Sequence, residues 1–101
     1  MLQYEKKKDA LIVRLSGELD HSAAGEMRGE LDALIARSGV KRLVFDLNGL
    51  TFMDSSGIGL IIGRYKQMAR RNGSVAVFGA DARMDRLFEM AGLYQLVDRL
   101  A

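Results

Sequence analysis

Hydrophobic and polar residues alternate near the start of the chain. The stretch ALIVRLSGELD at 10–20 has this period of two, which predicts a β-strand beginning at Ala10. A shorter strand over 2–6 would pair with it through a turn at 7–9. We therefore expect an N-terminal antiparallel hairpin.

After Asp20 the period changes to that of a helix. We expect Ser22 to cap this first helix and Gly39 to end it, because a serine hydroxyl satisfies free N–H groups and glycine adopts left-handed backbone angles. The apolar residues at helical spacing are Ala24, Met27, Leu31, Leu34 and Ile35.

A second strand and helix follow. The apolar run RLVFDL at 42–47 predicts a buried strand. The next helix should begin at the serines of the sequence DSSG, which spans 54–57, and end at Asn72-Gly73. One face of that helix would carry Ile58, Ile61, Ile62, Tyr65, Met68 and Ala69.

A third pair of elements follows, again a strand and then a helix. SVAVFGA at 74–80 predicts another buried strand, Asp81 would cap a third helix, and Gly92 would end it. Residues 93–100 could form a last short strand. The apolar residues of the helix are Met84, Leu87, Phe88 and Ala91.

This order predicts a single α/β domain over residues 1–101. Strands that alternate with helices form right-handed crossovers, so we expect a mostly parallel central sheet with the antiparallel hairpin at one edge and helices packed on it. Functional loops of such sheets gather beyond the carboxyl ends of the parallel strands. The polar residues expected there are Asp20, Asp54, Ser55, Ser56 and Asp81.

Composition narrows the classes of protein. Of 101 residues, 49% are hydrophobic and 28% charged, which suits one small globular domain. The 15 basic residues are scattered and nearly balanced by 13 acidic ones, so we expect no direct binding to nucleic acid. There is no cysteine for a disulfide or thiol nucleophile, and the longest apolar or glycine run, 58–63, is too short to cross a membrane. We expect a cytoplasmic domain without a metal or cofactor.

Several catalytic chemistries fit the sequence poorly. A serine hydrolase would have to use His21, the only histidine, and the pattern G-x-S-x-G is absent. His21 is better interpreted as a helix-entry residue. A phosphate-binding loop would need its glycines before Lys-Ser or Lys-Thr, and here they follow the hydroxyls. A phosphate-accepting receiver domain would need a second acidic residue beside Asp20 and a lysine after Lys66.

A serine at a helix N-terminus remains as a residue that another protein could modify. Backbone N–H groups and the helix dipole favour an anion there, so the domain would tolerate a phosphoserine. The simpler interpretation is that Asp54, Ser55 or Ser56 merely caps the helix. Glycines 57, 59 and 63 indicate that the sheet or a partner approaches this helix closely.

These residues resemble a known family. SGELDHSAA at 16–24 and LVFDLNGLTFMDSSGIGLIIGRYKQ at 43–67 closely resemble the anti-sigma factor antagonist family, the STAS domains, and above all its sporulation members. The likeness runs from about residue 4 to 97 and includes RLFEMAGLYQLV at 86–97. An [MI]-D-S-[ST]-G loop before a long apolar helix is the specific signal.

The resemblance implies a protein that is a substrate and ligand, and not an enzyme. An anti-sigma factor that is also a serine kinase would bind the unphosphorylated domain and release its sigma factor. It would then phosphorylate Ser55, which ends binding, and a serine phosphatase would restore the hydroxyl. By the same resemblance, Ser56 would cap the helix. The partner-binding residues would be Asp20, His21, Asp54, Ser55, Ser56, Gly57, Ile58 and Gly59.

Two alternative functions remain open, and the sequence departs from the family pattern in one respect. The domain could serve another partner-switching or stress-signalling pathway, or it could be a small hydrolase that uses Ser55 with His21. Sporulation members of the family carry a further C-terminal helix, whereas this sequence ends at Ala101. We therefore expect that helix to be absent or truncated.

Overall fold

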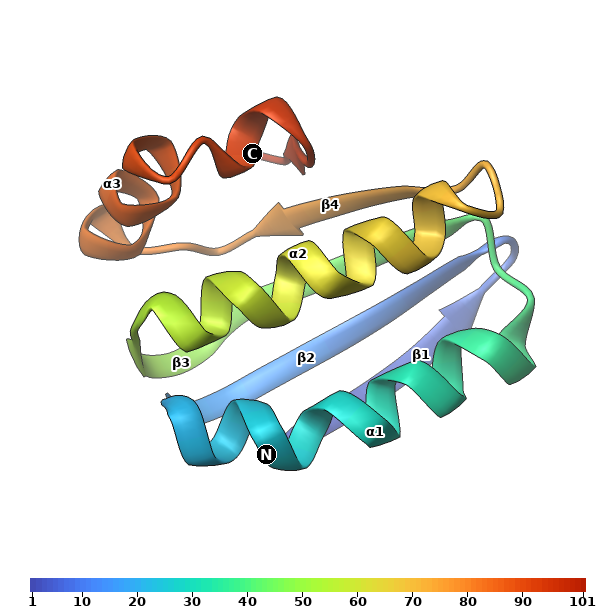
Figure 1. Cartoon of the computed structure of the whole chain (residues 1–101), viewed down its shortest axis with the longest axis horizontal. Helices are drawn as coiled ribbons and strands as arrows, with labels where there is room; N and C mark the ends of the chain where they lie inside the picture. The colour runs from blue at the N-terminus through green and yellow to red at the C-terminus, as the bar shows by residue number, and fades with distance from the viewer.

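The computed structural model describes residues 1–101 and contains one five-stranded sheet in the order β1-β2-β3-β4-β5. Three helices and one short 3-10 helix connect the strands (Figure 1). The elements are β1 (Leu2–Lys7), β2 (Ala10–Leu19), α1 (His21–Ser38), β3 (Arg42–Met53), α2 (Ser55–Ala69), β4 (Ser74–Phe78), α3 (Ala82–Met90), η1 (Leu93–Gln95) and β5 (Asp98–Arg99).

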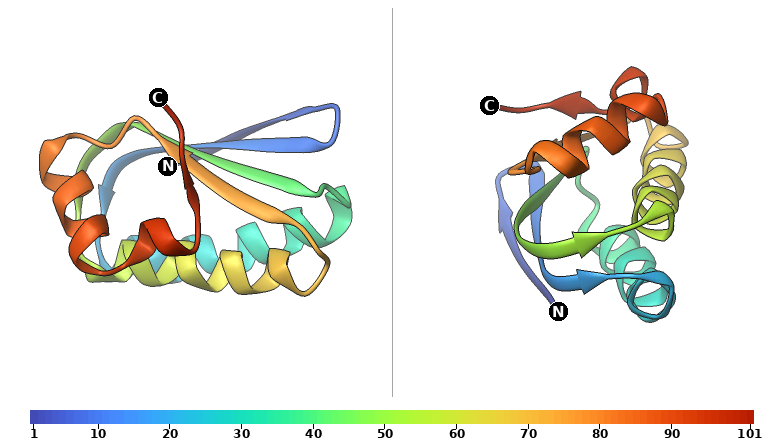
Figure 2. Two further views of the ribbon diagram at one scale, coloured as in Figure 1. Left: turned by 90° about the horizontal axis from the view of Figure 1, so that it is seen from above. Right: turned by 90° about the vertical axis from the view of Figure 1, so that its left-hand side faces the viewer.

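The predicted fold class is confirmed. β1 pairs antiparallel with β2, and all the other strand pairs are parallel. Lys8 has a φ of 54° in the hairpin turn. α1 and α2 lie side by side on one face of the sheet, and α3 lies beyond the carboxyl end of β4 (Figure 2). Twenty-five buried residues form a single hydrophobic core, which gives α1 and α2 a firm base.

Strand β3 is longer than the predicted 42–47 because its second half pairs with a bulged part of β2. Ser16 pairs with Gly49 and Leu19 with Met53, with one register shift between Arg14 and Ser16 and a second between Gly17 and Glu18. Each bulge adds a residue, so the period of two breaks down. The predicted strand therefore ends at Leu47, whereas β3 continues to Met53.

The start of α1 corrects one prediction. Asp20 caps α1, accepting a hydrogen bond from the Ala23 backbone N–H at 2.9 Å, so Ser22 lies inside the helix and does not cap it. The C-terminal end was predicted correctly, because Gly39 follows Ser38 with a φ of 68°.

The last third of the chain also differs in detail from the sequence prediction. β4 ends at Phe78 and not at residue 80, since Gly79 has a φ of 82°, which leaves the strand region. The predicted strand over 93–100 is mostly wrong. Its first residues form η1, and only Asp98–Arg99 pairs with β4.

Helix α2 buries a broader face than its spacing predicted. Leu60 and Arg64 are buried with Ile58, Ile61 and Met68, whereas Ala69 is exposed. α2 packs against α1 as well as the sheet, which accounts for the wider face.

Candidate partner-binding site

Three helices begin at the same edge of the sheet, each from an aspartate. Asp20, Asp54 and Asp81 follow the carboxyl ends of β2, β3 and β4. Each side chain accepts a hydrogen bond, 2.8–2.9 Å long, from a backbone N–H two or three residues further on. Such caps fix the direction of each helix. The helix N-termini therefore form one rigid edge, at the left of Figure 1.

Asp54, and not a serine, caps α2. Its Oδ1 accepts from the Ser56 backbone N–H at 2.8 Å, which corrects the expectation that Ser56 is the cap. Ser55 is the first residue of the helix and is exposed, and its hydroxyl makes no hydrogen bond within the domain. A free hydroxyl at a helix N-terminus is open to a modifying enzyme, and the local N–H groups favour an anion there.

Ser56 lies in a different environment from Ser55. It is half-buried, and its Oγ lies 3.5 Å from Nδ1 of His21, the first residue of α1. Tertiary folding therefore brings together two predicted site residues that are 35 positions apart in the chain. The histidine contacts Ser56 and not Ser55, which argues against a hydrolase that would use Ser55 with His21.

The next three predicted residues divide into buried and exposed positions. Gly57 and Ile58 are buried at the base of α2, whereas Gly59 is exposed with open space around it. A Cβ on Gly57 would lie 2.6 Å from Met53 Cγ and 3.0 Å from Leu19 Cδ2. Gly57 therefore lets α2 sit directly on the ends of β2 and β3.

Two side chains that the sequence did not single out, one aromatic and one basic, border the DSSG loop. Phe52 is 37% exposed, and the Arg83 guanidinium lies 5.2 Å from its ring centroid. Arg83 Nη1 also donates to the Met53 carbonyl oxygen at 3.0 Å. This ties α3 to the residue just before Asp54. The period of β3 gave no signal for an exposed aromatic residue, because the strand is bulged there.

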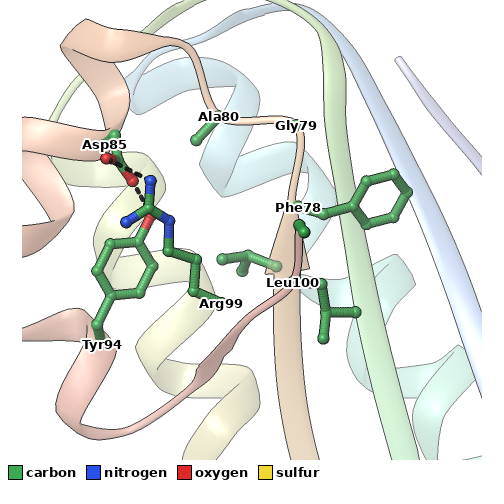
Figure 3. A pocket seen from close by; sticks show the side chains of 9 residues that line it. Phe78, Gly79, Ala80, Asp85, Tyr94, Arg99 and Leu100 are labelled. Atoms are coloured by element: carbon green, nitrogen blue, oxygen red, sulfur yellow. Dashed lines mark hydrogen bonds and ion pairs between the residues drawn. The ribbon is translucent and has the colours of Figure 1, made fainter.

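A separate cavity of about 230 Å³ lies between β4 and the C-terminal residues (Figure 3). On one side of it Asp85 accepts a hydrogen bond from the Tyr94 hydroxyl at 2.5 Å and pairs with Arg99 at 2.9 Å. Burial, followed by the hydrogen bond to Asp85, raises the pKa of the Tyr94 phenol above its ordinary value. These groups satisfy one another, so the cluster holds the C-terminal segment against α3.

Two chemical features are lacking in the described structure. No group of three or more histidine, cysteine, aspartate or glutamate side chains is placed to hold a metal ion. None of the helices combines the length and apolar character that crossing a membrane requires.

Comparison with known proteins identifies the family. The model of the STAS domain family matches residues 1–101. The chain belongs to the STAS domain family. It is 41% identical over 96 residues to a Paenibacillus polymyxa protein named anti-sigma F factor antagonist, covering 95% of this chain and 82% of that relative.

Other STAS proteins support the same assignment. The chain is 30% identical to an anti-sigma-B factor antagonist of Listeria monocytogenes, covering 93% of this chain and 82% of the relative. The solved structure of the Bacillus cell fate determinant SpoIIAA in its phosphorylated form superposes with a TM-score of 0.78 at 28% identity, covering 100% of this chain and 92% of that one. The resemblance found in the sequence is thus confirmed at the level of the family and the fold.

Proposed function

We propose that this STAS domain is an anti-sigma factor antagonist controlled by phosphorylation of Ser55. In the unphosphorylated form it would bind an anti-sigma factor that is also a serine kinase, and thereby free the sigma factor. The observation that carries the proposal is the exposed, unbonded hydroxyl of Ser55 on a rigid helix N-terminus. The names of its relatives, which include anti-sigma F and anti-sigma-B factor antagonists, point to the same role.

Accessibility favours Ser55 over Ser56 as the acceptor. A kinase must surround the acceptor oxygen with its own groups, which requires a hydroxyl that projects from the surface. Ser55 meets this requirement, whereas Ser56 is half-buried with its Oγ against His21. We therefore assign the phosphate to Ser55 and a positioning role to Ser56.

Electrostatics explains how one phosphate would end binding. A phosphoserine carries about −1.5 to −2 charges at pH 7. Next to Asp54 it would repel any surface shaped for a neutral hydroxyl, and its bulk would separate the two surfaces. The domain itself would stay folded, because the N-terminal N–H groups of α2 offset the added charge. A serine phosphatase in the same compartment, the cytoplasm, would reverse the change.

The proposed partner surface combines loop and helix residues. His21, Ser55 and Gly59 offer exposed positions, and Asp20 and Asp54 hold the helices in place. The buried Gly57 and Ile58 would act by fixing α2 to the sheet. The neighbouring Phe52 and Arg83 add an aromatic ring and a cation, the residue types that often dominate binding energy at interfaces.

The direct test is phosphate transfer to matched variants. The full chain is incubated with its kinase and ATP, and intact and tryptic masses are measured by mass spectrometry. We expect wild type and Ser56→Ala to gain one phosphate and Ser55→Ala to gain none. Ser55→Ala should still bind the kinase, and Ser55→Asp should lose binding. Unchanged transfer to Ser55→Ala would show that the site assignment is wrong.

A second candidate function is an interaction module of another partner-switching or stress-signalling pathway, since the name of the Listeria relative, anti-sigma-B factor antagonist, points to a different sigma factor. The two candidates predict the same surface but different partners. Affinity capture from native lysate with Ser55→Ala as bait, and Ser55→Asp as the negative control, would distinguish them. Recovery of a sporulation-type sigma regulator supports the first candidate, and recovery of a stress-type kinase supports the second.

A further inference from the structure

The outer face of α3 carries a small open cleft. Its volume is about 180 Å³, and it is lined by two arginines and two apolar residues. Neighbouring members of this set are three or four positions apart, so they form one stripe along the helix. The lining residues are Arg83, Arg86, Leu87 and Met90.

The apolar part of the cleft is open to solvent. The Met90 side chain is 80% exposed, and Leu87 is only half-buried. The core contact of α3 is made by Met84 and Phe88, which are both buried. A single exposed apolar residue is common on protein surfaces, but apolar side chains that share one cleft rimmed by charge are typical of an interaction site. Methionine suits such a site because its flexible side chain adapts to the shape of a partner.

The charge of the cleft is positive and unpaired. No carboxylate of the domain forms an ion pair with Arg83 or Arg86. The acidic residues of α3 are engaged elsewhere: Asp85 lies 2.9 Å from Arg99 beside the cavity of Figure 3, and Glu89 lies 3.9 Å from the same guanidinium. The cleft therefore presents two arginines that lack a carboxylate partner.

The cleft lies next to the loop that carries Ser55. Arg83 Nη1 donates to the Met53 carbonyl oxygen at 3.0 Å, and the guanidinium lies 5.2 Å from the Phe52 ring centroid. α3 and the N-terminal end of α2 lie at the same end of the molecule, at the left of Figure 1. From Arg83 to Met90 a helix rises about 10 Å. A partner that covers Ser55 can therefore extend over the cleft.

We propose that the cleft binds an acidic segment of the kinase in which carboxylates flank one apolar side chain, an inference that rests on the proposed function. The apolar side chain would contact Leu87 and Met90. The carboxylates would accept hydrogen bonds from Arg86 and from the remaining N–H groups of Arg83. Complementary charge would guide this segment into place and disfavour basic segments.

Two other classes of ligand match the cleft less well. Nucleic acid is bound by an extended row of cations, whereas the cleft has two and the whole domain has a net charge of only +2. An amphipathic helix binds a membrane through its apolar face, and that face of α3 is already buried in the core. A protein segment of opposite charge fits both the cations and the apolar floor.

The first test compares the affinities of variants for the kinase that modifies Ser55. All are made in the full chain with Ser55→Ala, which should take no phosphate, and binding is measured by isothermal titration calorimetry. We expect Arg86→Glu to weaken binding by about tenfold or more and Met90→Ser to weaken it several-fold. Both positions are exposed, so both variants should fold, which thermal denaturation verifies. Lys8→Glu is the matched control, because it changes the net charge equally in an exposed turn at the opposite end of β2.

The second test identifies the chemistry of the bound segment. The chain has no cysteine, so Met90→Cys introduces a single thiol to which a benzophenone maleimide is attached. On irradiation of the complex we expect a cross-link, located by mass spectrometry, to a kinase segment in which acidic residues flank an apolar one. The same label on Lys8→Cys should give no cross-link. Absence of a cross-link from Met90→Cys, or a cross-link to a segment without acidic residues, overturns the proposal.

The outcomes separate this inference from the proposed function. If Arg86→Glu and Met90→Ser bind as tightly as Ser55→Ala alone while Ser55→Asp loses binding, the cleft lies outside the interface and the proposed function stands. If Ser55→Asp binds as tightly as wild type, the proposed function fails and this inference fails with it. Equal weakening by Lys8→Glu and Arg86→Glu would reveal a general effect of net charge and would also contradict binding in the cleft.

Discussion

Replacing Gly57 with alanine tests how α2 is seated on the sheet. The added Cβ would lie 2.6 Å from Met53 Cγ and 3.0 Å from both Met53 Sδ and Leu19 Cδ2. Both neighbours are fully buried, and the closest atom is near the backbone end of the methionine, where it has little freedom to move. The side chains or the helix must therefore shift.

The magnitude follows from two opposing terms. Overpacking a core costs about 1–3 kcal/mol. Alanine gains up to about 1 kcal/mol over glycine inside a helix, and less in the first turn, where this residue lies. We expect Gly57→Ala to lower the free energy of unfolding by about 1–2 kcal/mol, with the melting temperature falling by about 4–8 °C for each kcal/mol.

Gly59→Ala is the matched control because it lies on the same helix and has no atom within 4 Å of its Cβ position. Only the propensity term applies to it, so it should raise stability by up to about 1 kcal/mol. Urea denaturation followed by circular dichroism measures both variants. If Gly57→Ala proves as stable as wild type or Gly59→Ala, the close approach of α2 to Met53 does not constrain the fold as argued.

Two further predictions concern the bonded side chains around the site and the C-terminal segment. Asp54→Ala should lower the free energy of unfolding by about 1 kcal/mol, because it removes the acceptor for the Ser56 backbone N–H. Asp54→Asn keeps an acceptor and should lower the free energy of unfolding by only a few tenths of a kcal/mol. Equal losses of stability for the two variants in thermal denaturation would contradict the capping role. Tyr94→Phe should lower the free energy of unfolding by about 1 kcal/mol at neutral pH, because the Tyr94 hydroxyl that donates to Asp85 is removed. Since the folded pKa of Tyr94 is raised above the ordinary value of 10, the unfolded chain loses this proton first, and the stabilisation declines as the pH rises above 10. The difference between wild type and Tyr94→Phe, measured by urea denaturation, should narrow over that range, and a constant difference would refute this account.

Much of the fold could be predicted from local sequence. Helix periods and aspartate or glycine boundaries depend on residues within a few positions of one another, so the order of elements and the parallel sheet were predicted correctly. The second half of β3 was not, because its pairing with the bulged part of β2 joins residues more than thirty positions apart. Ser22 was misassigned as a cap because Asp20, two residues earlier, offers an equally suitable side chain.

The candidate site was predicted in position but not in detail. The strand order alone placed the DSSG loop at the carboxyl edge of the sheet. Only the tertiary structure brought His21 to Ser56 and Arg83 to Phe52, and left Ser55 exposed.

The sequence by itself determined the elements, their order and the helix N-terminus that carries Ser55, since these follow from local periods and caps. The tertiary structure decided which side chains are buried away from solvent. Arg64 shows the difference: its sequence context is that of an ordinary helix residue, and only the packing of α1 against α2 buries its charge beside Asp32. Burial of a polar group depends on a distant segment, which a local pattern does not encode.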